Sequence, residues 1–245
     1  MSSSATRVVK LRQAGQRLGD MGISAGGIAS LLIIWWLVHL VYPSLIPSPW
    51  TSMKDAYDLI ASGTFVPHML QTLKRVLVGF GIAMTCAVGI GILMGSVRTA
   101  NRFFSPLVII GLTIPGMIMA FLAIMLFGLS EITPFFAVSV TIFPMLVINI
   151  WQGVASLDKD LIDMSTAIGL SPLSKVKDVI LPQLISPLLA ATRYGLGLAW
   201  KVVVIVEMFA TGNGVGYKIL AAYENFSMRG VLSWTITFIL AMMVI

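Results

Sequence analysis

Charged residues are scarce in this sequence: aspartate, glutamate, lysine and arginine make up only 11% of its 245 residues, whereas hydrophobic residues make up 58%. An ordinary soluble domain is about one quarter charged. No globular core needs so much apolar surface, so the composition excludes a soluble globular protein and predicts an integral membrane protein. We therefore interpret the net charge of +6 by its distribution across a bilayer, and not as a nucleic-acid-binding surface.

Residues that hold metals or activate substrates are equally rare. The single cysteine, Cys86, excludes an intrachain disulfide, and His39 and His68 have no partners at metal-ligand spacing, so we expect no metal site. The sequence lacks the Gly-x-x-x-x-Gly-Lys-Ser/Thr phosphate loop, so we expect this chain to hydrolyse no ATP and to bind no cofactor itself. No clustered His, Cys, Ser or carboxylate constellation indicates a membrane-embedded enzyme.

Long apolar runs are what the sequence has in abundance. A bilayer core of roughly 30 Å needs about 20 helical residues, and only helices satisfy the backbone of single spans in lipid. We predict an all-α integral membrane protein with a cytoplasmic basic segment at 1–22 and one transmembrane domain at 23–245. Its six expected spans are 23–42, 69–97, 104–129, 133–153, 183–210 and 227–245. The last span has no polar tail, and whether the native chain continues beyond Ile245 stays open.

The basic residues predict that both termini are cytoplasmic. An even number of spans places them on one side, and the positive-inside rule favours the side with more Lys and Arg. The other side would hold Lys54, Lys218 and Arg229, with Lys74 and Arg75 near the start of the second span. The proposed cytoplasmic side holds Arg7, Lys10, Arg12, Arg17, Arg98, Arg102, Lys159, Lys175 and Lys177. The N-terminal segment is thus interpreted as the flank of a retained first helix.

One polar insert, "DMSTAIGLSPLSKVKDVILP" (163–182), interrupts the apolar second half. The residues from Leu161 to Ile168 predict a helix, and Gly169 suits its left-handed C-terminal stop. Ser171 and Pro172 are typical of the cap and first residue of a second helix. We expect that helix to run to Leu181 and to end or kink at Pro182.

The first helix of this insert has an apolar stripe. Leu161, Met164 and Ile168 follow helical i, i+3, i+7 spacing among acids and hydroxyls. A stripe of this kind outside the membrane commonly fills a groove on another protein. The alternative is a helix that lies on lipid headgroups.

The insert resembles the cytoplasmic coupling loop of permease subunits from binding-protein-dependent ABC importers. The family pattern is Glu-Ala-Ala, three residues, Gly, nine residues, Ile, one residue, Leu-Pro. It falls here on Asp163-Met164-Ser165, Gly169, Val179 and Leu181-Pro182, with Met-Ser in place of Ala-Ala. Four further segments are similar to the nitrate, sulfonate, taurine and bicarbonate branch of this family: "LIPSPW" (45–50), "TLKRVLVGFGIA" (72–83), "TIPGM" (113–117) and "VEMFATGNGVGY" (206–217).

The resemblance implies a type I importer permease fold and a set of partners. These are two ATP-binding cassette subunits that use ATP and Mg, an extracytoplasmic solute-binding protein and a second copy of this chain, in the cytoplasmic (inner) membrane of a prokaryote. The substrate would be a small organic anion such as a sulfonate or carboxylate. The coupling loop, at about 155–182, would include Leu161, Asp163, Met164, Ala167, Ile168, Gly169, Leu170, Leu181 and Pro182.

Charges inside the fifth span are candidates for the translocation path. A charged side chain at the bilayer centre costs at least about 2.5 kcal/mol, so Lys201 and Glu207 each need a neighbour or an aqueous path. They lie about 120° apart around a helix and do not pair along one face. An anionic substrate beside Lys201 and an interhelical ion pair both remain open.

The third span supplies the other path candidates. Pro106 and Pro115 are expected to bend it, since each removes a backbone donor. An apolar lining suits an organic solute, whereas the alternative is ordinary lipid- or helix-facing surface. The full set of path candidates is Pro115, Met117, Met119, Phe121, Lys201 and Glu207. "TGNGVGYK" (211–218) is interpreted as a tight turn, and the small residues at 87, 91 and 95 and at 191, 195 and 199 as helix-packing stripes.

A self-contained secondary transporter or channel of six helices is the alternative function. Such a carrier needs no docking loop with a glycine corner, and we find no convincing internal repeat of the kind that many carriers have. The sequence therefore favours the ABC importer permease.

Overall fold

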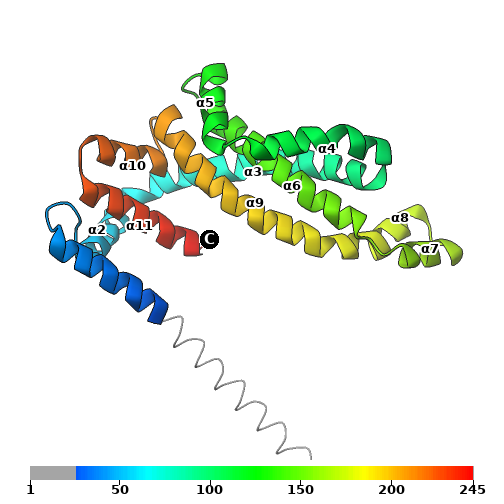
Figure 1. The fold of residues 1–245 in the computed structure, drawn as a ribbon, viewed down its shortest axis with the longest axis horizontal. Coiled ribbons are helices and arrows are strands. Elements are labelled where there is room, and N and C mark those ends of the chain that lie inside the picture. The colour runs from blue at the N-terminus through cyan, green and yellow to red at the C-terminus, as the bar shows by residue number, and fades with distance from the viewer. Residues whose placement is uncertain (1–25, 245) are drawn as a thin grey trace, which may run out of the picture. The chain divides into compact units, whose positions relative to one another are not determined.

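The computed structural model describes residues 26–244, in which every regular element is helical (Figure 1). The helices form two compact units, one from residues 63–221 and one from the described residues on either side of it. This confirms the all-α class within the described residues. The two units are treated separately below.

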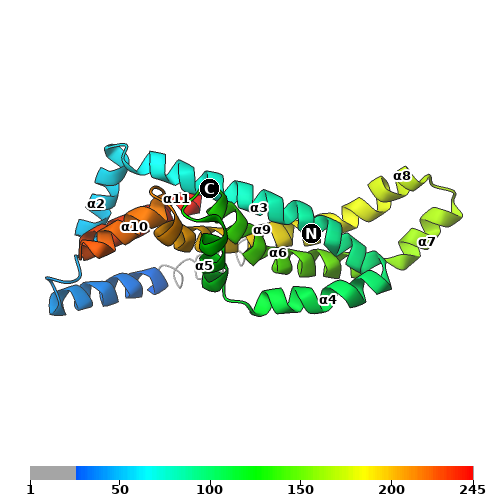
Figure 2. The same ribbon diagram turned by 90° about the horizontal axis from the view of Figure 1, so that it is seen from above.

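Long helices form the core of the central unit. Figure 2 shows α3, α6 and α9 side by side, and these helices contact one another along their lengths. The order of elements is α3 (Phe65–Ser96), α4 (Arg98–Thr113), α5 (Gly116–Phe127), α6 (Ile132–Ala155), α7 (Lys159–Ala167), α8 (Pro172–Lys175), a π-helical turn (Val176–Ile180), α9 (Leu181–Ala210) and α10 (Val215–Glu224).

Small residues let these helices approach closely. A β-carbon added to Gly91 of α3 would lie 2.8 Å from the Ile150 side chain of α6. One added to Gly195 of α9 would lie 2.6 Å from the Leu146 side chain of α6. Both positions belong to the small-residue stripes expected from the sequence, so the packing interpretation is confirmed.

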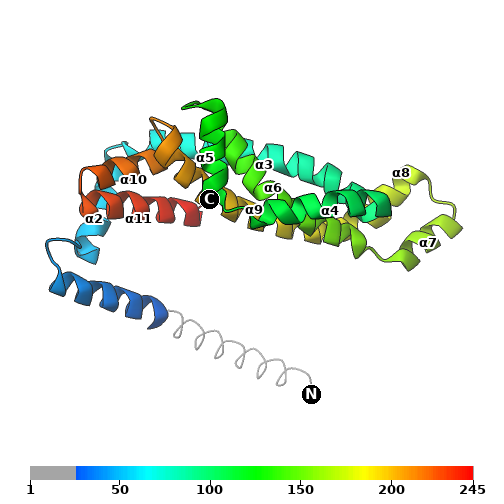
Figure 3. The same ribbon diagram turned by 45° about the horizontal axis from the view of Figure 1, so that its top comes forward.

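The expected third span is broken rather than gently bent. The helix ends at Thr113, Ile114 and Pro115 are extended, and α5 begins at Gly116 with its axis turned by 97° from α4 (Figure 3). A residue before proline is disfavoured in the helical region, and the proline has no N–H to donate. Pro106, by contrast, lies inside α4.

Three described helices are long and apolar enough to span a membrane: α3, α6 and the continuous helix Pro172–Ala210. Counting the bent pair α4–α5 as one span gives four. The helices Gly26–Val41 and Met228–Met243, at two other expected spans, are apolar but shorter. Six spans and cytoplasmic termini stay predictions, and residues 23–25 of the first span lie outside the described residues.

The second unit contains the helix Gly26–Val41, α2 (Pro49–Ala61) and α11 (Met228–Val244). Ser48 caps α2, because its Oγ accepts a hydrogen bond from the Thr51 N–H at 3.1 Å, and Pro49 takes the first helical position. α2 packs against α11. An ion pair between Asp55 and Arg229 joins the two helices.

Candidate coupling helices and translocation path

The expected first helix of the polar insert forms, but it begins at Lys159, two residues before the expected start at Leu161. Asp158 caps α7, because its Oδ1 accepts hydrogen bonds from the backbone N–H groups of Asp160 at 2.9 Å and Leu161 at 3.3 Å. The Asp158 N–H donates in turn to Gln183 Oε1 at 2.9 Å. These contacts fix where α7 starts and tie its first residues to α9.

Gly169 forms the corner between the two short helices. Its φ of +75° is in the left-handed region, where a β-carbon is unfavourable. The Gly169 N–H donates to the Thr166 carbonyl at 3.0 Å and the Leu170 N–H to the Ser165 carbonyl at 3.1 Å. This pair of bonds is a Schellman motif, so the predicted glycine stop is confirmed.

The second helix of the insert does not end at Pro182. Ser171 caps α8 and Pro172 opens it, as predicted, but the chain then stays helical from Pro172 to Ala210. The π-helical turn before Pro182 allows this, because the Leu181 N–H donates to the Val176 carbonyl five residues back. The wider turn gives the proline ring room, so of the stop or kink expected at Pro182 the stop does not occur.

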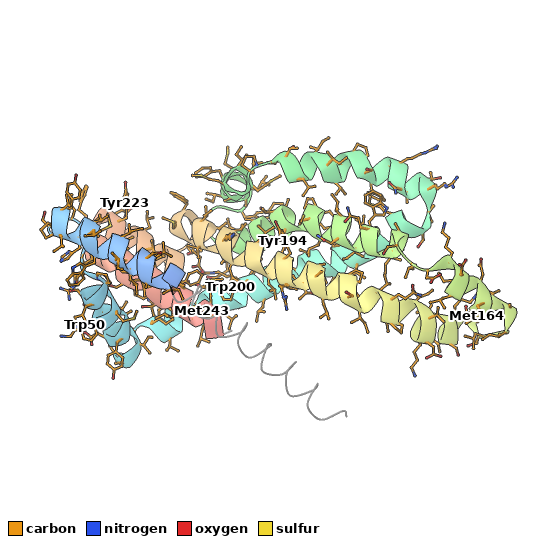
Figure 4. All side chains as sticks on the ribbon, turned by 60° about the horizontal axis from the view of Figure 1, so that its bottom comes forward. Trp50, Met164, Tyr194, Trp200, Tyr223 and Met243 are labelled. Carbon is orange, nitrogen blue, oxygen red and sulfur yellow. The ribbon has the colours of Figure 1, made fainter. Side chains whose placement is uncertain are left out.

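The helix pair presents its apolar stripe outward. Figure 1 shows α7 and α8 extending past the ends of α6 and α9, and Figure 4 shows Met164 on that extension. The side chains of Leu161, Met164 and Ile168 are exposed, Met164 by 57%. Lys175 Nζ donates to Thr166 Oγ1 at 2.7 Å, which braces α8 against α7. Among the other residues of the expected loop, Leu170 is half-buried, and the exposed ones are Asp163, Ala167, Gly169, Leu181 and Pro182.

The path candidates on α5 lie next to α9. Pro115 directly precedes α5, Met117 is exposed and Met119 is half-buried. The Phe121 ring lies against that of Phe209 on α9, with centroids 5.6 Å apart. The structure thus brings Phe121 of α5 to the last turns of α9.

One face of α9 is exposed and basic. Arg193, Tyr194 and Lys201 line a shallow hollow along this helix, on a face different from the one that packs on α3 and α6. Figure 4 labels Tyr194 on α9. Arg193 and Lys201 lie about 12 Å apart along the axis and about 80° apart around it. Among the described residues, neither has an ion-pair partner.

Glu207 does not lie on this face. Its side chain is fully buried, and Oε1 accepts a hydrogen bond from Arg75 Nη1 of α3 at 2.7 Å. Oε2 accepts from Thr72 Oγ1 at 2.9 Å and from the Gly216 N–H at 3.0 Å. The interhelical ion pair left open by the sequence is therefore the arrangement that Glu207 adopts.

Arg75 is the residue that sequence reasoning missed. Its Nη1 also donates to the Asn213 carbonyl at 3.0 Å, and its Nη2 to Asn213 Oδ1 at 2.6 Å. The guanidinium makes a second ion pair with Glu131, in the turn before α6. One buried cation thus connects α3, α9 and the turns 128–131 and 211–214. The "TLKRV" segment held the signal, since an arginine within an apolar helix needs a buried acid.

The turn after α9 is held by the same cluster. Residues 211–214 connect α9 to α10 as the expected tight turn. Gly214 has a φ of +104°, and its N–H donates to His68 Nδ1 at 3.1 Å. The Val215 N–H donates to Thr72 Oγ1 at 3.0 Å. Residues 26–244 contain no group of three or more His, Cys, Asp or Glu that could hold a metal ion.

Close-packed apolar helices of membrane-spanning length, with an exposed polar helix pair at one end, are the architecture expected of an integral membrane permease. Residues 87–245 match the model of the family described as the inner membrane component of binding-protein-dependent transport systems. Because the match covers more than half of the chain, this chain belongs to that family.

The relatives place the chain in the predicted branch. A Brucella melitensis protein named as an ABC transporter permease is 31% identical over 84% of each chain. A Bacillus subtilis permease named for aliphatic sulfonates is 26% identical over 86% of this chain and 77% of its own. A Synechocystis permease named for nitrate import is 29% identical over 82% of this chain and 76% of its own.

A solved structure shares the fold. A chain of the MetNI methionine ABC transporter in an inward-facing conformation matches with a TM-score of 0.58 and 18% identity, over 74% of this chain and 92% of that one. At this identity the match shows the fold alone, and it confirms the predicted type I permease fold.

Proposed function

We propose that α7 and α8 couple this permease to separate ATPase subunits, and that two copies of the chain enclose a path for a small organic anion such as a sulfonate or carboxylate. The observation that carries the proposal is the exposed stripe of Leu161, Met164 and Ile168 beyond the ends of α6 and α9. Apolar side chains on a helix outside the bilayer are stabilised when another protein covers them.

The continuous helix Pro172–Ala210 supplies the mechanical connection. ATP and Mg are bound by the partner ATPases, two per complex, and this chain binds no cofactor and hydrolyses no ATP. When those subunits close, they move the corner at Gly169, and α9 moves with α8 because no break separates them. Such coupling requires a rigid element with two positions, and both the ATPase and the substrate path must shift the equilibrium between them.

The basic face of α9 supports an anionic substrate. A cation exposed to hydrocarbon is costly, so Arg193 and Lys201 are better placed beside water and a passing anion than beside lipid. The relatives named for sulfonates and nitrate also support a negatively charged substrate. The exposed Met117 and Phe121 side chains favour an organic solute. An extracytoplasmic solute-binding protein would deliver it across the inner membrane of a prokaryote.

Co-purification with the partner ATPase tests the coupling. A Met164→Asp variant places a charge in the stripe and should lose the ATPase during purification in detergent. Leu129→Asp is the matched control, because Leu129 is also exposed, by 77%, but lies at the other end of α6. The control should keep the ATPase at the wild-type ratio.

Two results would contradict the proposal. Equal ATPase retention by both variants would show that the stripe is not the contact. Uptake driven by an ion gradient in vesicles that contain this chain alone would instead indicate a self-contained transporter.

A further inference from the structure

An aromatic stripe on α2 is exposed among the described residues of its unit. Trp50, Met53, Tyr57 and Ile60 recur at helical spacing and lie within a sector of about 80°. All four side chains are exposed, Trp50 by 77% and Tyr57 by 70%, and Figure 4 labels Trp50 on this helix.

Contacts with α11 determine which way this stripe points. Ser52 and Ala56, on another side of α2, are buried. The Asp55 carboxylate accepts hydrogen bonds from Arg229 Nε and Nη2 of α11, both at 2.5 Å. Since Asp55 binds α11 and Ser52 and Ala56 are buried, the aromatic stripe lies on the remaining, exposed side of α2.

The chain before α2 folds back along an apolar helix. Trp35 Nε1 donates a hydrogen bond to the Pro47 carbonyl at 3.2 Å, and His39 Nδ1 lies 2.7 Å from the Ile46 carbonyl. Trp35 is six residues before Val41, or about 9 Å back from the helix end. α2 therefore begins level with the body of the helix Gly26–Val41, not beyond its end.

That apolar helix is itself exposed around its circumference. Its exposed large side chains, in the part of the chain that the structure describes, are Ile28, Leu31, Leu32, Ile33, Ile34, Trp36, Leu37, Leu40 and Val41. A helix that is hydrophobic all round is stable when protein or membrane covers it. In this membrane protein, lipid is the surrounding that fits it.

The chain after α2 is equally restricted. Only residues 62–64 separate Ala61 from Phe65, the first residue of the membrane-length helix α3. Four Cα steps reach at most about 14 Å. Whatever the placement of the two units, α2 is tethered at both ends to apolar helices and cannot move far from the membrane surface.

We propose that α2 is an interfacial helix that lies in the boundary between lipid headgroups and acyl chains, with Trp50, Met53 and Tyr57 directed into the bilayer. Trp and Tyr are enriched in this layer, where an apolar ring and a polar group are both satisfied. The charged residues of α2 are Lys54, Asp55 and Asp58, which give no cationic face. The bilayer that it binds therefore need not be anionic.

Spin labelling of the full chain tests this orientation. In a Cys86→Ser background, single cysteines replace Met53 or Asp58 and carry a nitroxide in phosphatidylcholine nanodiscs. Both positions are exposed, and five residues place them about 140° apart around the helix. Collision rates with oxygen, which enters lipid, and with a water-soluble nickel chelate then report each side separately.

We expect oxygen collisions to exceed nickel-chelate collisions at residue 53 and the reverse at residue 58. Nickel-chelate accessibility at residue 53 equal to that at residue 58 would overturn the proposal, because both sides would face water. Low accessibility of residue 53 to both reagents would also overturn it, since a protein would then cover the stripe. The oxygen signal should be unchanged by added anionic lipid.

Discussion

A glutamine in place of Glu207 would break the buried cluster with almost no change of shape. The carboxylate has three donors around two oxygens: Arg75 Nη1 on Oε1, and Thr72 Oγ1 and the Gly216 N–H on Oε2. A glutamine side chain has only one oxygen. In either orientation of the amide, the NH₂ group faces an N–H or O–H group that had bound a carboxylate oxygen. That donor is left without an acceptor.

The cost follows from burial. Removal of one partner from a buried ion pair costs about 3–5 kcal/mol. Arg75 keeps Glu131 and Asn213 as acceptors, so we expect the lower end, about 3 kcal/mol. In a chain of this length, 1 kcal/mol corresponds to roughly 2–4 °C of melting temperature. The expected loss is therefore about 10 °C.

Thermal unfolding of the purified protein in detergent measures this loss. Glu224→Gln is the matched control, because Glu224 is exposed and its substitution should change stability by less than about 0.5 kcal/mol. Hydrogen exchange should also increase in residues 211–218, where Glu207 holds the Gly216 amide. If Glu207→Gln melts with the control and residues 211–218 stay protected, the carboxylate does not hold this turn and the reasoning is wrong.

Three further substitutions test other parts of the structure. Gly169→Val should uncouple ATP hydrolysis from uptake, because a β-branched residue in the left-handed region costs about 1–2 kcal/mol. Gly169→Asn should keep the two coupled, because asparagine tolerates the left-handed region. Equal uptake-to-hydrolysis ratios in the two variants would contradict this. Gly195→Ala should lower the melting temperature and Gly197→Ala should not, since only at Gly195 would an added β-carbon meet side chains; identical melting would exclude tight packing there. The hydrogen bonds from Arg229 lower the pKa of Asp55, so the carboxylate stabilises the fold above its unfolded pKa of 3.8, and this contribution is lost as the pH falls through the lower folded value. Hydrogen exchange in α2 should thus rise steeply below about pH 4 in wild type, whereas Asp55→Asn should show weaker protection already at neutral pH; the same pH profile in both would refute it.

Local signals in the sequence were sufficient for the polar insert. The corner at Gly169 and the cap at Ser171 depend on one or two residues and their immediate backbone, so the pattern predicted them correctly. Of the stop or kink expected at Pro182, the stop does not occur, because a π-helical turn accommodates the proline within a continuous helix. That turn has no simple signature in the residues that form it.

Contacts between residues far apart in the chain could not be predicted from the sequence alone. Arg75 and Glu207 are 132 positions apart, and a count of basic residues assigned Arg75 to the membrane surface. The break at Pro115 could not be read from the proline alone, since Pro106 and Pro144 lie inside continuous helices. Such features are decided by tertiary structure, which a single sequence does not display.

Site-specific photo-cross-linking from residue 164 tests the coupling claim most directly. A photoreactive amino acid replaces Met164 in the complete transporter in its membrane, and replaces Leu129 in a control. We predict a cross-link from residue 164 to the ATPase subunit and none from residue 129. Active ATP-driven uptake with no cross-link from residue 164 would contradict the claim that the exposed stripe of α7 receives the ATPase.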